Sequence, residues 1–191
     1  VSPTPSFWGS AVPDSMCHKV PVSISAAGIG AGEVTTVITP DTPSYECAPP
    51  ISDTTFLPDG SGVSYSTSIE VTCFTACDTI TDGSDILDVC LIMEHSYLGD
   101  LDWKITCPSG LSATIKQYPG GGGTYLGGAI DDGSLIAGTG VQYCFSDDAA
   151  WGTMLTELGL GTTVLAGVPL SASMAPGEYK PFQSFDNLIG C

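Results

Sequence analysis

The side chains that could do chemistry in this sequence are a histidine, His95, and several paired acids. Asp100, Asp131 and Asp132 lie in predicted turns, whose flexible oxygens suit the irregular ligand shell of Ca²⁺. Glycoside hydrolysis would need two carboxylates held across a cleft in different environments, which sequence spacing cannot establish. A calcium site at Asp100, Asp131 and Asp132 is therefore the metal hypothesis, with solvated turn acids as its alternative.

His95 could serve as a general base for a serine or cysteine nucleophile. The sequence contains only two histidines and has neither a Gly-x-Ser-x-Gly elbow nor a His-Glu-x-x-His zinc motif. Its even number of cysteines predicts that the thiols are consumed in disulfides. We therefore expect His95 to be a buried, hydrogen-bonded structural residue and the protein not to be an enzyme.

The overall charge excludes one class of partner. Four lysines and no arginine stand against 21 acidic residues, so the net charge of the 191-residue chain is −17. Such a charge repels phosphate backbones and anionic lipid surfaces, so nucleic acid is not expected as a partner. No apolar run reaches the length of a membrane span, and no membrane insertion is expected.

The eight cysteines contain no Cys-x-x-Cys pair, which favours an oxidised framework over zinc knuckles and predicts an extracellular protein. Eight cysteines allow 105 pairings, so chain order can only suggest a set. It suggests Cys17 with Cys47, Cys73 with Cys77, Cys90 with Cys107, and Cys144 with Cys191.

Glycine and proline, with 24 and 14 residues, and the low share of charged residues favour short strands and turns, hence an all-β fold. Residues 63–73 alternate cleanly between apolar and polar side chains and predict a half-exposed strand. Residues 89–93 and 101–107 predict two strands of an antiparallel hairpin, which would place Cys90 opposite Cys107. The glycines of 120–128 lack the ending of a phosphate-binding loop and predict a flexible connection.

The chain divides near residue 56. Residues 1–55 are rich in proline and contain two short alternating runs, which predict an extended arm and a small β subdomain or linker. Residues 56–191 contain the longer strand patterns and are expected to form the main sandwich.

The central stretch also carries a family resemblance. His95-Ser96-Tyr97-Leu98-Gly99-Asp100-Leu101, with Cys107-Pro108-Ser109-Gly110 after it, resembles the signature of the P domain, or Homo B domain, of proprotein convertases. It looks most like bacterial relatives in large secreted surface proteins of Bacteroidota, including gliding-motility-associated proteins exported by the type IX system. The resemblance implies a jelly-roll antiparallel β-sandwich without catalytic residues, in which His95, Tyr97, Gly99 and Asp100 are architectural.

Three triplets resemble the O-glycosylation acceptor described for Bacteroidota, with acceptors at Ser15, Thr54 and Thr79, each in a predicted loop. In the family, further strands follow the counterpart of Cys191, so the resemblance also implies a sandwich that is incomplete at its C-terminus. Either a longer chain supplies those strands, or a neighbouring subunit donates one by β-augmentation.

The function expected from all of this is a non-catalytic structural or adhesion module of a large secreted cell-surface or filament protein. Its partners would be neighbouring domains or neighbouring subunits. The alternatives are a calcium-dependent module that binds glycans and an accessory P domain of a secreted protease. No cofactor other than Ca²⁺ is expected.

Overall fold

The alternating patterns form ten strands and three short 3-10 helices in the part of the chain that the structure describes. This computed structural model describes residues 56–57, 63–71, 79–130, 136–159 and 173–191, and the strand backbone at 4–7, 20–27, 33–35 and 55. The elements are β1 (Thr4–Phe7), β2 (Val20–Ala27), β3 (Glu33–Thr35), β4 (Thr55–Phe56), β5 (Ser64–Val71), η1 (Gly83–Asp85), β6 (Ile86–Met93), η2 (Leu98–Asp100), β7 (Asp102–Thr106), β8 (Ser112–Lys116), β9 (Val141–Phe145), β10 (Gly177–Tyr179) and η3 (Phe185–Leu188).

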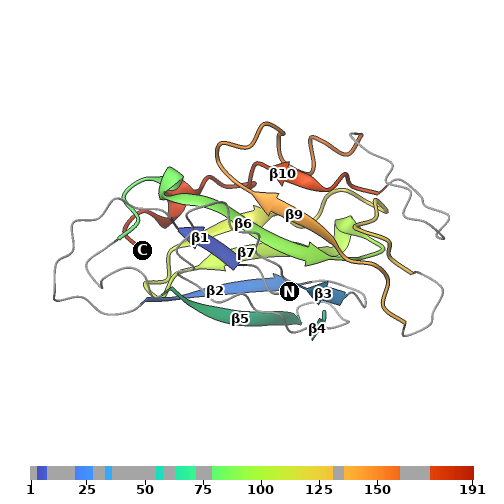
Figure 1. The fold of residues 1–191 in the computed structure, drawn as a ribbon, viewed down its shortest axis with the longest axis horizontal. Helices are drawn as coiled ribbons and strands as arrows, with labels where there is room; N and C mark the ends of the chain where they lie inside the picture. The colour runs from blue at the N-terminus through green and yellow to red at the C-terminus, as the bar shows by residue number, and fades with distance from the viewer. Residues whose placement is uncertain are drawn as a thin grey trace.

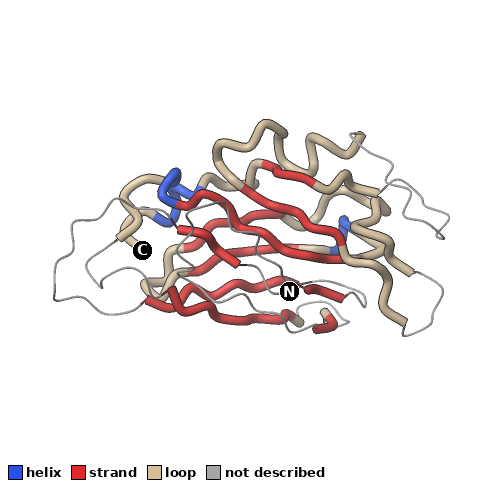
Figure 2. Tube along the Cα trace, viewed as in Figure 1, coloured by secondary structure: helices blue, strands red, loops and turns tan. Residues whose placement is uncertain are grey.

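The strands form two sheets (Figures 1 and 2). The six-stranded sheet has the order β10-β9-β6-β3-β4, with β1 also paired to β6. The four-stranded sheet has the order β5-β2-β7-β8. All pairs are antiparallel except β9 with β10. The all-β class predicted from composition is therefore confirmed.

One hydrophobic core is shared by the two sheets. In β5 the burial alternates as the sequence predicts, with Ile69 and Val71 buried and Ser68 and Glu70 exposed. On β6, Val89, Leu91 and Met93 are buried. The two sheets meet where the Trp103 ring of β7 packs edge-on against the Phe145 ring of β9, with centroids 5.7 Å apart. Each large apolar side chain buried in this way contributes about 1.5–3 kcal/mol to folding.

Strands β6 and β7 lie in different sheets, so the predicted hairpin is wrong. The intervening residues 94–101 carry the chain from one sheet to the other and pair with residues around Leu126 instead of forming a tight turn. Strands that face one core from opposite sides show the same alternation as strands of a hairpin, because each buries every second residue. The sequence pattern could not distinguish the two arrangements.

Both disulfides that the structure describes differ from the suggested pairs. Cys90 is bonded to Cys144, its direct partner across β6 and β9, and Cys107 is bonded to Cys191. The pairs Cys90–Cys107 and Cys144–Cys191 are therefore wrong, because β6 and β7 diverge into separate sheets and cannot place their cysteines opposite each other. The suggested pairs of Cys17 with Cys47 and Cys73 with Cys77 lie outside the described residues.

The segment 1–55 contributes strands to both sheets. Strand β2 lies between β5 and β7, while β1 and β3 pair one after the other with β6. This arrangement differs from the predicted separation at residue 56. The apolar alternation of residues 20–24 gave a strand, as expected, but its partners are distant in sequence and local patterns do not reveal them.

The C-terminal segment covers the outer edge of β8. The backbone N–H groups of Phe182 and Gln183 donate to the carbonyls of Ile115 and Thr114, at 2.8 and 2.9 Å. The disulfide from Cys107 to Cys191 then fixes the end of this segment. A strand edge that would otherwise be open is thereby satisfied.

We expect the double variant C107S/C191S to lose about 2–4 kcal/mol in its free energy of unfolding, because a long loop is no longer closed. Hydrogen exchange should also accelerate in β8 and in residues 182–191. Denaturant unfolding and exchange mass spectrometry measure the two effects. Unchanged exchange in both segments would contradict the proposed covering role of the C-terminus.

Candidate functional site

The signature residues lie in a pair of loops that are joined by backbone hydrogen bonds. The signature loop (residues 94–101) and the glycine-rich loop (residues 120–128) exchange two bonds between His95 and Leu126, at 3.1 and 2.8 Å. The N–H of Leu98 donates to the carbonyl of Thr124 at 2.8 Å, and that of Gly99 to Gly122 at 2.9 Å. The glycine-rich loop is therefore held along its length, in contrast to the flexible connection that its composition predicted.

Gly99 makes this pairing sterically feasible. A Cβ atom at position 99 would lie 3.1 Å from three backbone atoms of Gly122, closer than nearly all Cβ contacts in proteins. Gly121 and Gly122 have φ values of +96° and +51°, which are unfavourable for other residues. The glycines thus permit two backbones to approach closely and turn.

His95 is almost fully buried, and its Nδ1 accepts a hydrogen bond of 3.0 Å from the backbone N–H of Tyr97. An accepting Nδ1 carries a lone pair, so the proton of the neutral ring lies on Nε2. The imidazole therefore binds the first turn of the signature loop, and the architectural role of His95 stays a prediction.

Lys116, at the end of β8, is a buried cation beside the signature loop. Its Nζ donates a 2.8 Å hydrogen bond to the carbonyl of Leu101, and only 2% of the residue is exposed. Burial lowers the pKa of Lys116 to about 8, although the carboxylates of Asp102 and Asp100 oppose the shift. The sequence analysis missed Lys116, whose place beside Trp103 in the β7–β8 pair would be predicted only from the correct register.

The far end of the glycine-rich loop is anchored to the core. The hydroxyl of Tyr143 accepts from the N–H of Gly127 at 2.7 Å and donates to the carbonyl of Met174 at 3.3 Å. The hydroxyl of Ser173 donates to the carbonyl of Gly127 at 3.0 Å. Burial raises the pKa of Tyr143 to about 12, so this phenol is neutral at physiological pH.

Tyr97 is the exposed side chain of this loop pair. It is 47% exposed, and a Cβ at Gly123 would lie 3.3 Å from its ring, so the ring lies beside the backbone of the glycine-rich loop. Asp100 is half-buried three residues further along. An exposed aromatic ring is a group on which a planar or sugar ligand can stack.

The structure describes only one of the three residues predicted to bind calcium. Asp100 is described, whereas Asp131 and Asp132 lie outside the described residues. Within the described ranges, no group of three or more His, Cys, Asp or Glu side chains is arranged to hold a metal ion. Calcium binding at Asp100 stays a prediction, and the ammonium of Lys116 already lies near that carboxylate.

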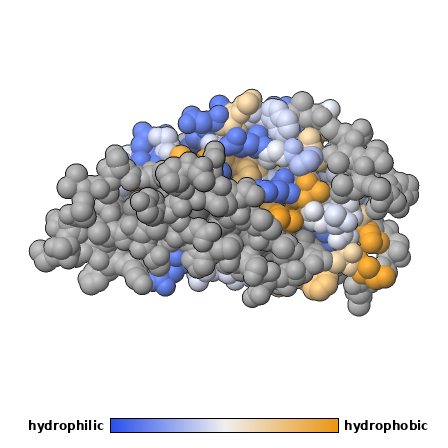
Figure 3. All heavy atoms as spheres, viewed as in Figure 1, coloured by the Kyte–Doolittle hydropathy of each residue, from blue (hydrophilic) through white to orange (hydrophobic). Residues whose placement is uncertain are grey.

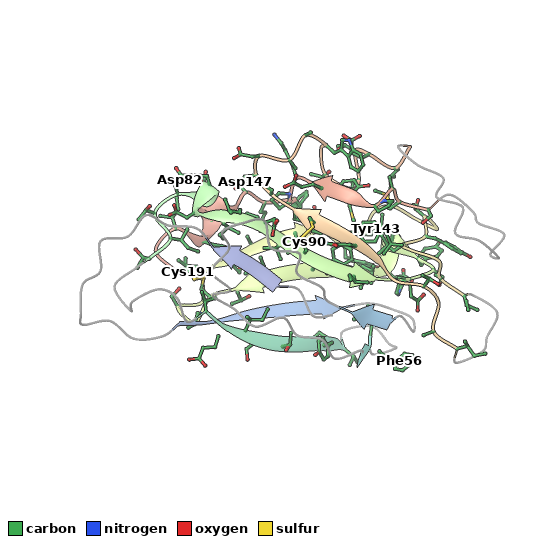
Figure 4. The ribbon with its side chains drawn as sticks, viewed as in Figure 1. Phe56, Asp82, Cys90, Tyr143, Asp147 and Cys191 are labelled. Atoms are coloured by element: carbon green, nitrogen blue, oxygen red, sulfur yellow. A yellow bond between two sulfur atoms is a disulfide. The ribbon has the colours of Figure 1, made fainter. Side chains whose placement is uncertain are left out.

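A second acidic group joins η1 to η3 and was not predicted as a unit (Figure 4). Asp147 accepts hydrogen bonds from the N–H of Phe185 at 2.8 Å and the hydroxyl of Ser184 at 3.0 Å. Asp186 accepts from the N–H of Gly83 at 3.0 Å. Asp82 and Asp85 form a capping box around η1, and hydrogen bonds lower the pKa of both. Asp82 and Asp85 cap η1 through neighbouring residues, whereas Asp147 and Asp186 bind backbone N–H groups that are far away in sequence.

Of the three glycosylation candidates, only Thr79 is described. It is exposed, and the adjacent Ile80 is tied by backbone hydrogen bonds to Gly190 and Cys191. Ser15 and Thr54 lie outside the described residues. Modification of any of the three stays a prediction.

We expect Gly99→Ala to destabilise the protein by about 1–3 kcal/mol, because the added methyl group meets the backbone of Gly122. Gly159→Ala is the matched control, since a Cβ there meets nothing within 4 Å. Thermal or urea unfolding measures both variants. Equal stabilities would show that the two loops do not approach as described.

The lowered pKa of Lys116 predicts that the free energy of unfolding rises with pH. Its folded pKa of about 8 lies below the ordinary value of 10.5, so between these values the unfolded chain binds more protons and folding is favoured as pH rises. Tyr143 acts in the opposite sense only above about pH 10. Urea midpoints from pH 8 to 10 should therefore increase, and Lys116→Met should flatten the rise. Lys104→Met removes the same charge and should leave it in place; a flat wild-type profile would contradict the prediction.

Three comparisons bear on the identity of the chain. No family model, no curated protein and no solved structure matches it. The function must therefore be inferred from the geometry of the loop pair and from the chemistry of its side chains.

Proposed function

We propose that this chain is a non-catalytic extracellular module with a structural or adhesive role in a larger cell-surface or filament protein. The observation that carries the proposal is the way in which the signature loop is held. His95 accepts a hydrogen bond from a backbone N–H, Gly99 permits the approach of Gly122, and Lys116 donates to the carbonyl of Leu101. Each of these groups fixes the path of the signature loop, which is the work of an architectural motif.

The cysteines support the proposed location. All four described cysteines are in disulfides, and such bonds persist in oxidising compartments. We therefore propose that the protein is exported to the cell surface. No helix in the described part of the chain is long and apolar enough to span a membrane.

The proposed family is the P domain, with a jelly-roll connection of the two sheets. It is supported by the signature motif and by a two-sheet, all-β architecture. In this proposal, strands β1, β2 and β3 from residues 1–55 take positions in the two sheets of the sandwich.

A second candidate function is glycan binding, with or without Ca²⁺. The exposed ring of Tyr97 beside the glycine-rich loop favours it, because sugar rings stack on exposed aromatic side chains. Asp100 would then supply a hydrogen-bond acceptor or a calcium ligand next to the ring.

The structural role predicts that an antibody against the chain labels intact cells of its source and that a panel of protease and glycosidase substrates is not turned over. Turnover that is abolished by His95→Gln or Asp100→Asn, in a variant that still folds, would contradict the proposal. A glycan array with and without chelator tests the second candidate. Binding that Tyr97→Ala removes, and that Tyr118→Ala at another exposed ring leaves intact, would favour it over the structural role.

A further inference from the structure

Strand β5 is an edge strand in the part of the chain that the structure describes. It pairs with β2 along its whole length, from Val20 opposite Val71 to Ala27 opposite Ser64, without a register shift. It is the terminal strand of the four-stranded sheet, and no strand among the described residues covers its other side (Figure 1). Half of the backbone groups of such a strand point outward and can pair with another strand.

Two other terminal strands, β8 and β10, are covered on their outer sides. Residues 182–183 bind the outer side of β8, and the N–H of Lys180, next to β10, donates to the carbonyls of Trp151 and Gly152 at 3.2 and 3.1 Å. Strand β5, eight residues long, contains no lysine, no proline and no bulge. Proteins usually blunt long edges with such features, and Glu70 near its end is the one charged residue of this strand, so the edge indicates a surface that pairs.

We propose that the β5 edge pairs antiparallel with β5 of a second copy, with Thr67 opposite its own counterpart across a two-fold axis. This inference rests on the structural role proposed above and names a partner for it. The pairing would join the four-stranded sheets of two copies into one continuous sheet.

The strand sequence is self-complementary in this register. Paired residues must point to the same face of a sheet, so each position pairs with one an even number of residues away. With Thr67 at the centre, inward-facing Tyr65 lies opposite Ile69, and Val63 lies opposite Val71. On the outer face Ser64 lies opposite Glu70, so the two glutamates do not meet.

On the face shown in Figure 3, the described hydrophobic residues that are visible lie beside hydrophilic ones. Two copies each carrying a net charge of −17 repel each other, so the backbone pairing must overcome a long-range charge term. The dimer should therefore strengthen as salt screens this repulsion.

Sedimentation velocity over a concentration series up to about 1 mM tests the proposal. We expect a reversible dimer with a dissociation constant of roughly 10–1000 μM, typical of small interfaces. Its affinity should increase when salt rises from about 0.1 M to about 1 M, which shortens the Debye length from about 10 to 3 Å. A monomer at every concentration and salt would overturn the pairing.

The variant S66K/S68K places lysines opposite each other and should raise the dissociation constant at least tenfold. This is expected even though the two lysines make the chain less negative and so weaken the long-range repulsion between copies. The matched control S112K/T114K adds the same charges to β8, whose edge is covered, and should leave the constant unchanged. Equal weakening by both variants would overturn the assignment to β5. Circular dichroism confirms that each variant is folded.

Thr67→Cys gives an independent measurement if the lysine variant does not fold. Mild oxidation should cross-link it as a dimer through position 67, whereas Thr114→Cys should stay monomeric. Cross-linking of both to the same extent would contradict the register. A protein that stays monomeric would contradict the β5 pairing but not the structural role. A dimer that hydrolyses a substrate through His95 would contradict the structural role but not the pairing.

Discussion

The packing of Trp103 against Phe145 is the contact on which the arrangement depends. These rings come from β7 and β9, in opposite sheets, and meet edge-on in the middle of the shared core. Because β6 and β9 are neighbours in one sheet, this contact requires the chain to leave that sheet directly after β6. The signature loop makes this crossing, and its hydrogen bonds to the glycine-rich loop fix the path.

The crossing explains the roles of the residues in and beside the signature loop. A loop that passes between two sheets exposes backbone groups inside the protein, where each needs a partner. His95 accepts one N–H, Lys116 donates to one carbonyl, and Gly99 lets the second loop approach. The motif thus supplies the hydrogen bonds and the close backbone approach that the crossing needs. We therefore interpret it as structural.

The individual strands could be predicted, but their partners could not. The alternation in 64–71 and in 102–106 reported burial correctly, because every second residue faces the core whatever the neighbouring strand is. The hairpin and the disulfides of Cys90 and Cys107 were predicted wrongly because pairing depends on which sheet each strand joins. The place of β2 between β5 and β7 and the capping by Asp147 and Asp186 depend on contacts distant in sequence.

The disulfide map tests most directly the claim that β6 and β7 diverge into opposite sheets. Digestion of the unreduced protein with pepsin at low pH, which suppresses thiol exchange, allows the linked peptides to be identified by mass spectrometry. We expect peptides that join Cys90 to Cys144 and Cys107 to Cys191. A peptide joining Cys90 to Cys107 would contradict the divergence of the two strands, because that bond requires β6 and β7 to lie side by side.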